Sequence, residues 1–202
     1  TIDFEDWRNL DKSKSRDRLN LNIKNNENII IFGSERGSQI DRKNFPFLME
    51  VISKLISKIK IRLIVFGGNN KDYYEQKNLK INYLKHISDK KFLNTVYSAG
   101  DLLAMPSKIE TFGLVALESL LSGTPCVSFK NTGVEEVIDH KVNGYLANYL
   151  DKDDYEKGIL WILDQSKNLE IYKNTHHLPK RKFGNQLISD EYKKLYKEVL
   201  NT

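Results

Sequence analysis

The sequence predicts an α/β fold in which a parallel sheet of about six strands is covered by helices on both faces. Two patterns predict it. Short apolar runs rich in β-branched residues alternate along the chain with stretches whose apolar residues recur at helical spacing. The short runs are also continuously apolar, as expected for parallel strands that are buried on both faces. With 202 residues and no internal repeat, one domain is the simplest organisation.

The expected elements follow one another along the chain. Strands are expected at 28–33, 61–67, 81–84, 101–105, 124–129 and 144–147. Helical spacing predicts helices at 45–59, 89–99, 112–122, 154–164 and 185–201, with a helical turn at 133–139. Residues 168–184 are polar and contain Pro179, so no element is predicted there.

Composition excludes several classes of protein. The net charge of +5 is spread over short basic clusters, with no basic stripe among aromatic residues, so we expect no nucleic-acid partner. The single cysteine, Cys126, cannot form an intrachain disulfide and is expected to be a buried structural thiol. No run of eighteen apolar residues is present. We therefore expect a cytoplasmic protein, or one at the inner face of the membrane.

Ligands of such a fold bind beyond the carboxyl ends of the strands. The loops expected there begin at Gly33 and also include 67–68, 85–88, 106–111 and 130–133. In the fourth of these loops, Thr111 can cap the helix that follows, which would leave N–H groups near Gly113 free for phosphate.

Two carboxylates flank this helix start, in the stretch PSKIETFGLVALESLLSGTPCVSF (106–129). Glu110 precedes the helix and Glu118 lies about two turns into it. Carboxylates repel phosphate but pair with vicinal hydroxyls, so both would contact sugars. The alternative is an acid that stabilises the helix dipole together with an ordinary surface acid.

The same stretch resembles the signature of GT-B glycosyltransferases of family 4, which are retaining enzymes. The shared features are Pro-Ser, two glutamates separated by seven residues, Phe-Gly after the first, and a closing Gly-Thr-Pro-x-Val. Further matches are Asp101, Gly133, Glu136, the NGYL at 143–146 and a Gly-rich turn followed by Arg-Lys and a helix near 32–52. The resemblance covers roughly residues 28–200.

The resemblance implies roles for the residues of this stretch. Glu110 would contact the transferred sugar, and Glu118 the ribose hydroxyls. The backbone over the diphosphate would come from Thr111, Phe112, Gly113 and Leu114.

It also implies roles for residues elsewhere in the chain. Arg42 and Lys43 match a basic pair that neutralises the diphosphate; Lys43 aligns better and would stabilise the departing diphosphate. Ile87 would hold the base through its backbone, and the Gly-rich turn places Gly33 and Ser34 at the donor. Glu110 and Lys43 are thus the expected catalytic residues, and no metal or other cofactor is expected.

Two departures from the family pattern lie near the nucleotide. Gly133-Val134-Glu135-Glu136 lacks one glycine and the proline of Gly-Gly-x-Pro-Glu. Asn44 stands where the family has glycine after its basic pair. Both changes could alter nucleotide affinity or choice.

The implied function is that of a donor-binding domain. The enzyme would move a sugar from a UDP- or GDP-sugar to a glycan or lipid-linked acceptor, in cell-surface polysaccharide synthesis. All motifs match the C-terminal half of a GT-B fold: residues 1–27 would follow the interdomain crossing and pack on a single Rossmann-like domain at 28–202. The chain would then be a cut fragment or a separate subunit.

The acceptor would bind to a missing N-terminal domain, so the isolated chain is expected to be inactive. The full enzyme could associate peripherally with a membrane. Two alternatives remain open: a non-catalytic nucleotide-sugar-binding module, and a GT-B nucleotide-sugar epimerase, for which no acid and base residues can be assigned.

Overall fold

The predicted α/β fold is confirmed. The computed structural model describes residues 3–33, 41–68, 73–165 and 169–200. In these ranges one sheet of seven strands has the order β3-β4-β2-β1-β5-β6-β7. Its strands are β1 (Asn28–Gly33), β2 (Ile61–Phe66), β3 (Tyr73–Gln76), β4 (Leu79–Tyr83), β5 (Leu102–Met105), β6 (Cys126–Phe129) and β7 (Gly144–Ala147).

The seventh strand, β3, was not expected. It pairs antiparallel with β4 at the edge of the sheet, whereas the other six strands, all predicted, are parallel. Tyr74 and the residues that follow it in β3 are exposed. An exposed edge strand carries no continuous apolar run. The pattern that predicts buried strands therefore does not predict β3.

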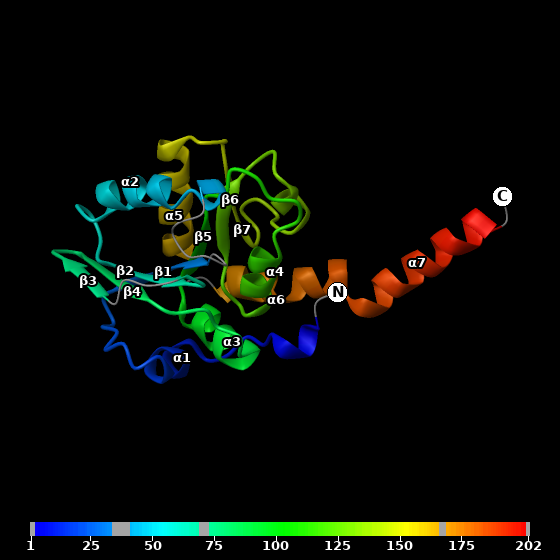
Figure 1. The fold of residues 1–202 in the computed structure, drawn as a ribbon, viewed down its shortest axis with the longest axis horizontal. Coiled ribbons are helices and arrows are strands. Elements are labelled where there is room, and N and C mark those ends of the chain that lie inside the picture. The colour runs from blue at the N-terminus through cyan, green and yellow to red at the C-terminus, as the bar shows by residue number, and fades with distance from the viewer. Residues whose placement is uncertain (1–2, 34–40, 69–72, 166–168, 201–202) are drawn as a thin grey trace.

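Helices cover both faces of the sheet (Figure 1). On one face lie α2 (Phe45–Leu55) and α5 (Lys152–Gln165), and on the other lie α1 (Lys12–Arg18), α3 (Lys90–Ala99) and α4 (Leu114–Leu121). The helical turn expected at 133–139 is a 3-10 turn, η4 (Gly133–Glu136). Helix α1 was not predicted because its sequence, KSKSRDR, has no apolar face.

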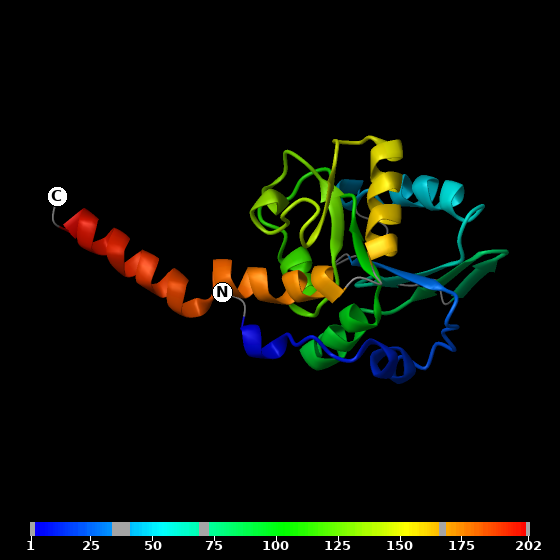
Figure 2. The ribbon, with the colours of Figure 1, turned by 180° about the vertical axis from the view of Figure 1, so that it is seen from behind.

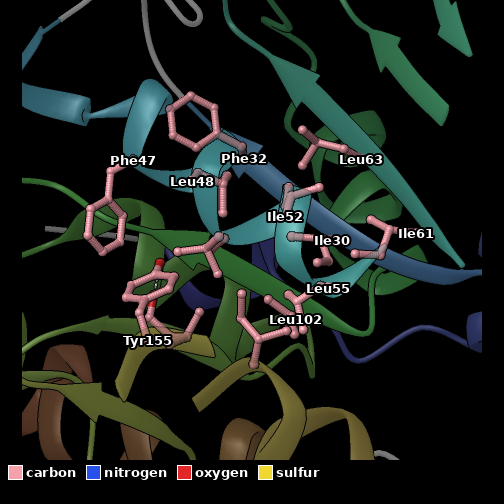
Figure 3. Close-up of a cluster of buried hydrophobic side chains, with 14 of the residues drawn as sticks. Ile30, Phe32, Phe47, Leu48, Ile52, Leu55, Ile61, Leu63, Leu102 and Tyr155 are labelled. Carbon is pink, nitrogen blue, oxygen red and sulfur yellow. Dashed lines mark hydrogen bonds between the residues drawn. The ribbon is translucent and has the colours of Figure 1, made fainter. Parts of the chain in front are cut away.

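Alternate side chains of the central strand, β1, pack into two separate cores on opposite faces of the sheet. In β1, Ile29 and Ile31 pack into the core on the α3–α4 side, and Ile30 and Phe32 into the core under α2 and α5. All four are at most 1% exposed. Burying each such side chain contributes about 1.5–3 kcal/mol, which explains why the strand is apolar throughout. Figure 3 shows Ile30 and Phe32 against the α2 side chains.

The segment before β1 packs along α3. Arg16 of α1 donates from Nη2 to both carboxylate oxygens of Asp101, at 2.8 Å each, and Asp101 accepts from the Ile29 amide at 2.7 Å. Asp101 therefore joins α1 to the amino ends of the strands, at the end of the sheet opposite the expected site. The division of the chain at residue 28 stays a prediction.

The chain continues after α5 in α6 (Leu169–Phe183) and α7 (Asn185–Leu200). Helix α6 forms in a region without a predicted element, with Pro179 inside it. Helix α7 extends away from the body (Figures 1 and 2). None of the helices in the described ranges is long and apolar enough to span a bilayer.

Asn44 precedes α2 in the left-handed conformation, with φ 57° and ψ 43°. Glycine adopts this conformation freely and asparagine is among the side chains that tolerate it best, which explains the exchange at this family position. We expect Asn44→Gly to leave the free energy of unfolding within about 0.5 kcal/mol, and Asn44→Val to lower it by about 1–3 kcal/mol. Urea denaturation measures both; a valine variant as stable as the glycine variant would contradict the assignment of backbone strain.

Candidate functional site

A cavity of about 560 Å³ opens at the carboxyl ends of β2, β4 and β5. Strand order changes direction at β1, which has β2 on one side and β5 on the other. Open α/β sheets bind ligands at such a switch point. The cavity is lined by Arg42, Lys43, Phe66, Gly67, His86, Ile87, Leu93, Tyr97, 110–115 and Glu118.

Most of the predicted site residues meet in this cavity. The predicted residues in its lining are Arg42, Lys43, Ile87, Glu110, Thr111, Phe112, Gly113, Leu114 and Glu118. Gly33 lies behind the lining: a Cβ there would be 2.3 Å from a ring carbon of Phe66, which does line the cavity. Ser34 lies outside the described residues.

Lys43 and Glu110 form an ion pair inside the cavity. Lys43 ends a 3-10 turn, η3 (Asp41–Lys43), and Glu110 lies in the loop after β5. Their side chains are 10% and 11% exposed, so the pair is held largely away from bulk water. The two expected catalytic groups are therefore adjacent, and each neutralises the other's charge.

Backbone contacts fix the Glu110 loop. The Lys108 amide donates to the Arg42 carbonyl, and the Gly133 amide donates to the Glu110 carbonyl, both at 2.8 Å. A Cβ on Gly133 would lie 2.0 Å from the carbonyl oxygen of Thr111. Glycine at 133 is thus a steric requirement for the position of the loop that carries Glu110.

The start of α4 differs in detail from the expectation. Thr111 does not cap this helix; Gly113 does, with φ 87°, a conformation that glycine alone adopts freely. The first helical residues are therefore Leu114 and Val115, whose N–H groups have no backbone acceptor in the described part of the chain. These two amides lie at the positive end of the helix dipole. The Leu114 amide was among the predicted donors, the Val115 amide was not, and the predicted Phe112 and Gly113 amides likewise have no backbone acceptor among the described residues.

Val134, one of the departures from the family pattern, packs beneath this turn. It is fully buried, and its Cγ2 would be 3.0 Å from a Cβ at Gly113. The valine fills the space under the helix start.

Glu118 receives a hydrogen bond from Tyr97, whose hydroxyl lies 3.0 Å from Oε2. Burial raises the pKa of Glu118 from its usual 4.5 to about 7, although the hydrogen bond from Tyr97 and the charge of Lys90 act in the opposite direction. Glu118 thus titrates near neutral pH while it faces a cavity. Such a perturbed acid in a cleft indicates a functional site.

The raised pKa of Glu118 predicts a pH-dependent loss of stability. Between about pH 4.5 and 7 the unfolded chain releases this proton before the folded protein does, so the free energy of unfolding falls with rising pH. We expect Glu118→Gln to abolish this fall and to stabilise the protein by about 1–3 kcal/mol at pH 8. Urea denaturation at pH 5 and pH 8 measures the difference; an equal effect at both pH values would contradict the shifted pKa.

Sequence reasoning missed several lining residues. Gly67 and His86 follow β2 and β4, in loops expected at the carboxyl ends of the strands, but neither residue was assigned a role. Leu93 and Tyr97 lie on the face of α3 that packs against the core, and that face also borders the cavity. Among the described residues, no group of three or more His, Cys, Asp or Glu side chains could hold a metal ion; independence from metals stays a prediction.

Comparison with known proteins identifies the family. The model of "Glycosyl transferases group 1" matches residues 13–177. The chain belongs to this family. The matched range contains every described residue of the cavity lining. Membership confirms the resemblance found in the sequence, whereas family 4 and the retaining mechanism stay predictions.

Relatives of this glycosyl transferase chain are longer proteins. An uncharacterized glycosyltransferase of Methanocaldococcus jannaschii is 26% identical over 188 residues, which cover 77% of this chain and 47% of that protein. Sucrose-phosphate synthase of Thermosynechococcus elongatus superposes with a TM-score of 0.76 at 19% identity, over 99% of this chain and 51% of that one.

HepE of Anabaena, solved in complex with UDP-glucose, gives a TM-score of 0.71 at 22% identity, over 96% of this chain and 56% of that one. These likenesses confirm a Rossmann-like domain of the GT-B kind. The chain spans about half the length of the proteins it matches.

Proposed function

We propose that this chain is the donor-binding domain of a retaining family 4 glycosyltransferase, which moves a sugar from a UDP- or GDP-sugar to an acceptor. One observation carries the proposal: Lys43, Glu110, Glu118 and the free amides at the start of α4 all face one cavity at the switch point of the sheet. The three parts of a nucleotide sugar need different partners. The diphosphate needs a cation and N–H donors, the ribose needs a carboxylate, and the transferred sugar needs a second carboxylate.

The charges determine how the donor lies. The diphosphate sits at the Leu114 and Val115 amides beside Lys43, because these groups supply positive potential. The ribose lies at Glu118, and the transferred sugar at Glu110. The base lies towards Ile87, near the apolar part of the lining. That HepE was solved with UDP-glucose supports a UDP-sugar as the donor.

This placement defines the work of the two catalytic residues. Transfer breaks the bond between the anomeric carbon and the diphosphate oxygen, and the bonding electrons leave with the diphosphate. Lys43 stabilises that negative charge as it develops. Glu110 holds hydroxyls of the sugar, so that its anomeric carbon is presented to the acceptor.

The remainder of the proposed enzyme supplies the acceptor site. The chain spans about half of the proteins it matches, which supports a further N-terminal domain that binds the acceptor. We propose a glycan or lipid-linked acceptor in cell-surface polysaccharide synthesis, on the cytoplasmic side of the membrane. Peripheral association with that membrane belongs to this proposal.

The isolated chain is expected to bind a nucleoside diphosphate and to transfer no sugar. Transfer gains about 7–11 kcal/mol from holding both reactants at attack distance, and that gain requires an acceptor site. Calorimetry with UDP, GDP and ADP tests binding and identifies the base. Incubation with UDP-glucose and GDP-mannose, with and without glycan acceptors, tests transfer.

The outcomes separate the candidate functions. Glycoside formation by the isolated chain would refute the missing acceptor domain, and an epimerised free sugar would favour the epimerase. Failure to bind any nucleotide would refute the site itself.

A further inference from the structure

Tyr97 is a fully buried tyrosine whose hydroxyl group reaches the cavity. Its side chain is 0% exposed, and its hydroxyl donates to Glu118 Oε2 at 3.0 Å. Burial and the nearby Glu118 raise the pKa of Tyr97 well above its usual value, so this hydroxyl remains a donor at all physiological pH values. Among the described residues, no other group donates a hydrogen bond to the Glu118 side chain.

The surroundings of Tyr97 hold that hydroxyl in one place. The Tyr97 ring packs against Trp7 and Phe66, with centroids 5.8 and 5.6 Å away. Its carbonyl accepts from the Thr124 hydroxyl at 2.6 Å. Because the ring and backbone are both fixed, the Tyr97 hydroxyl is a rigid reference point for the more exposed Glu118.

The elements packed against α4 carry other titratable groups, and none of those described is hydrogen-bonded to the Glu118 side chain. Lys90 of α3 acts on it through charge alone and is bound to Asp6 at 2.6 Å. In α6, which packs on α4, His176 contacts the carbonyl of Leu121.

The cavity lining contributes four more groups. Arg42, Lys43, His86 and Glu110 line the same cavity, and Lys43 is paired with Glu110.

We propose that Tyr97 is a positioning residue for the donor: its hydroxyl favours the ionised form of Glu118 and fixes its orientation, leaving Oε1 for the ribose hydroxyls. The part that concerns the ribose rests on the proposed function. The part that concerns Glu118 does not, because it describes a contact within this chain.

Removal of the hydroxyl has a definite consequence. A hydrogen bond to the ionised form lowers the pKa of an acid, so its loss raises the pKa of Glu118 further. More of the population then carries a protonated carboxyl at neutral pH, which accepts hydrogen bonds from ribose less well. The defect should therefore be large at pH 7 and small at pH 9.

The test compares two conservative variants, Tyr97→Phe and Tyr155→Phe. Tyr155 is a matched control, because it is also fully buried and donates to a backbone carbonyl, Val127 O at 3.0 Å, on the other face of the sheet. In each protein the carboxyl of Glu118 is titrated by carbon-13 NMR. UDP-glucose affinity is measured from pH 6 to 9; the two phosphates of this probe carry constant charge in that range.

For Tyr97→Phe we expect the Glu118 midpoint to rise by about one pH unit. UDP-glucose affinity should then fall about fivefold at pH 7 and recover to within about twofold at pH 9. Tyr155→Phe should leave both unchanged. An unmoved Glu118 midpoint, or an affinity loss that is the same at every pH, would overturn the proposal.

Two further outcomes are separable. If Tyr97→Phe does not fold, 3-fluorotyrosine at position 97, a stronger donor, should lower the Glu118 midpoint; no change would overturn the proposal. If the midpoint moves as expected but none of the proteins binds UDP-glucose, Tyr97 positions Glu118 and the proposed donor is wrong.

Discussion

Lys43→Ala is expected to lower UDP affinity about a hundredfold and to leave uridine affinity nearly unchanged. Lys43 supplies the positive charge beside the diphosphate, and hydrogen bonds to charged groups contribute about 1.5–3 kcal/mol each. The variant also leaves Glu110 without its partner, and this unpaired carboxylate repels the phosphates. Calorimetry with UDP and uridine measures both affinities, and equal losses for the two ligands would place Lys43 away from the diphosphate.

The same variant should be less stable, by about 2–4 kcal/mol, because breaking a largely buried ion pair leaves one charge uncompensated. The double variant Lys43→Ala/Glu110→Ala removes both charges and is the matched control. It should recover most of the stability and little of the UDP affinity. Recovery of both would show that Lys43 serves only to neutralise Glu110.

Gly133→Ala is expected to abolish measurable UDP-glucose binding and to lower the free energy of unfolding by about 3 kcal/mol or more. The new Cβ would lie 2.0 Å from the Thr111 carbonyl oxygen and 2.9 Å from that of Glu110. Both neighbours are backbone atoms, so the loop must move as a whole. That movement displaces Glu110 and the start of α4 together.

Gly158→Ala controls for general destabilisation. Gly158 lies in α5, which the cavity lining does not include, and a Cβ there would be 2.5 Å from a ring carbon of the buried Tyr145. This variant is therefore also strained, but away from the cavity. Urea denaturation and calorimetry on both variants separate stability from binding. If Gly133→Ala binds UDP-glucose as well as Gly158→Ala, the loop is not fixed by Gly133.

The central strands could be predicted from sequence because burial on both faces leaves a signal in every residue. Ile29 to Phe32 feed two cores in alternation, so all four are apolar. The exposed β3 and the polar α1 leave no such signal. Helix α1 is held instead by long-range contacts such as Arg16 to Asp101, and the local sequence does not encode these.

The positions of the two carboxylates in the candidate site could be predicted from the sequence. Glu110 and Glu118 flank a helix start, and their place in one cavity follows from the order of strand, loop and helix. Two features could not be predicted. The cap of α4 is Gly113 and not the predicted Thr111, because the turn requires a positive φ. The proposed role of Tyr97 depends on Glu118, a partner 21 residues away in another helix.

A crystal structure of this chain with UDP would show whether the donor binds in this cavity as proposed. We expect the diphosphate within hydrogen-bonding distance of the Leu114 and Val115 amides and of Lys43, with the ribose hydroxyls on Glu118. Lys43 should turn from Glu110 towards the phosphates. A nucleotide bound outside this cavity, or one whose ribose lies at Glu110 and whose phosphates lie away from the start of α4, would contradict it.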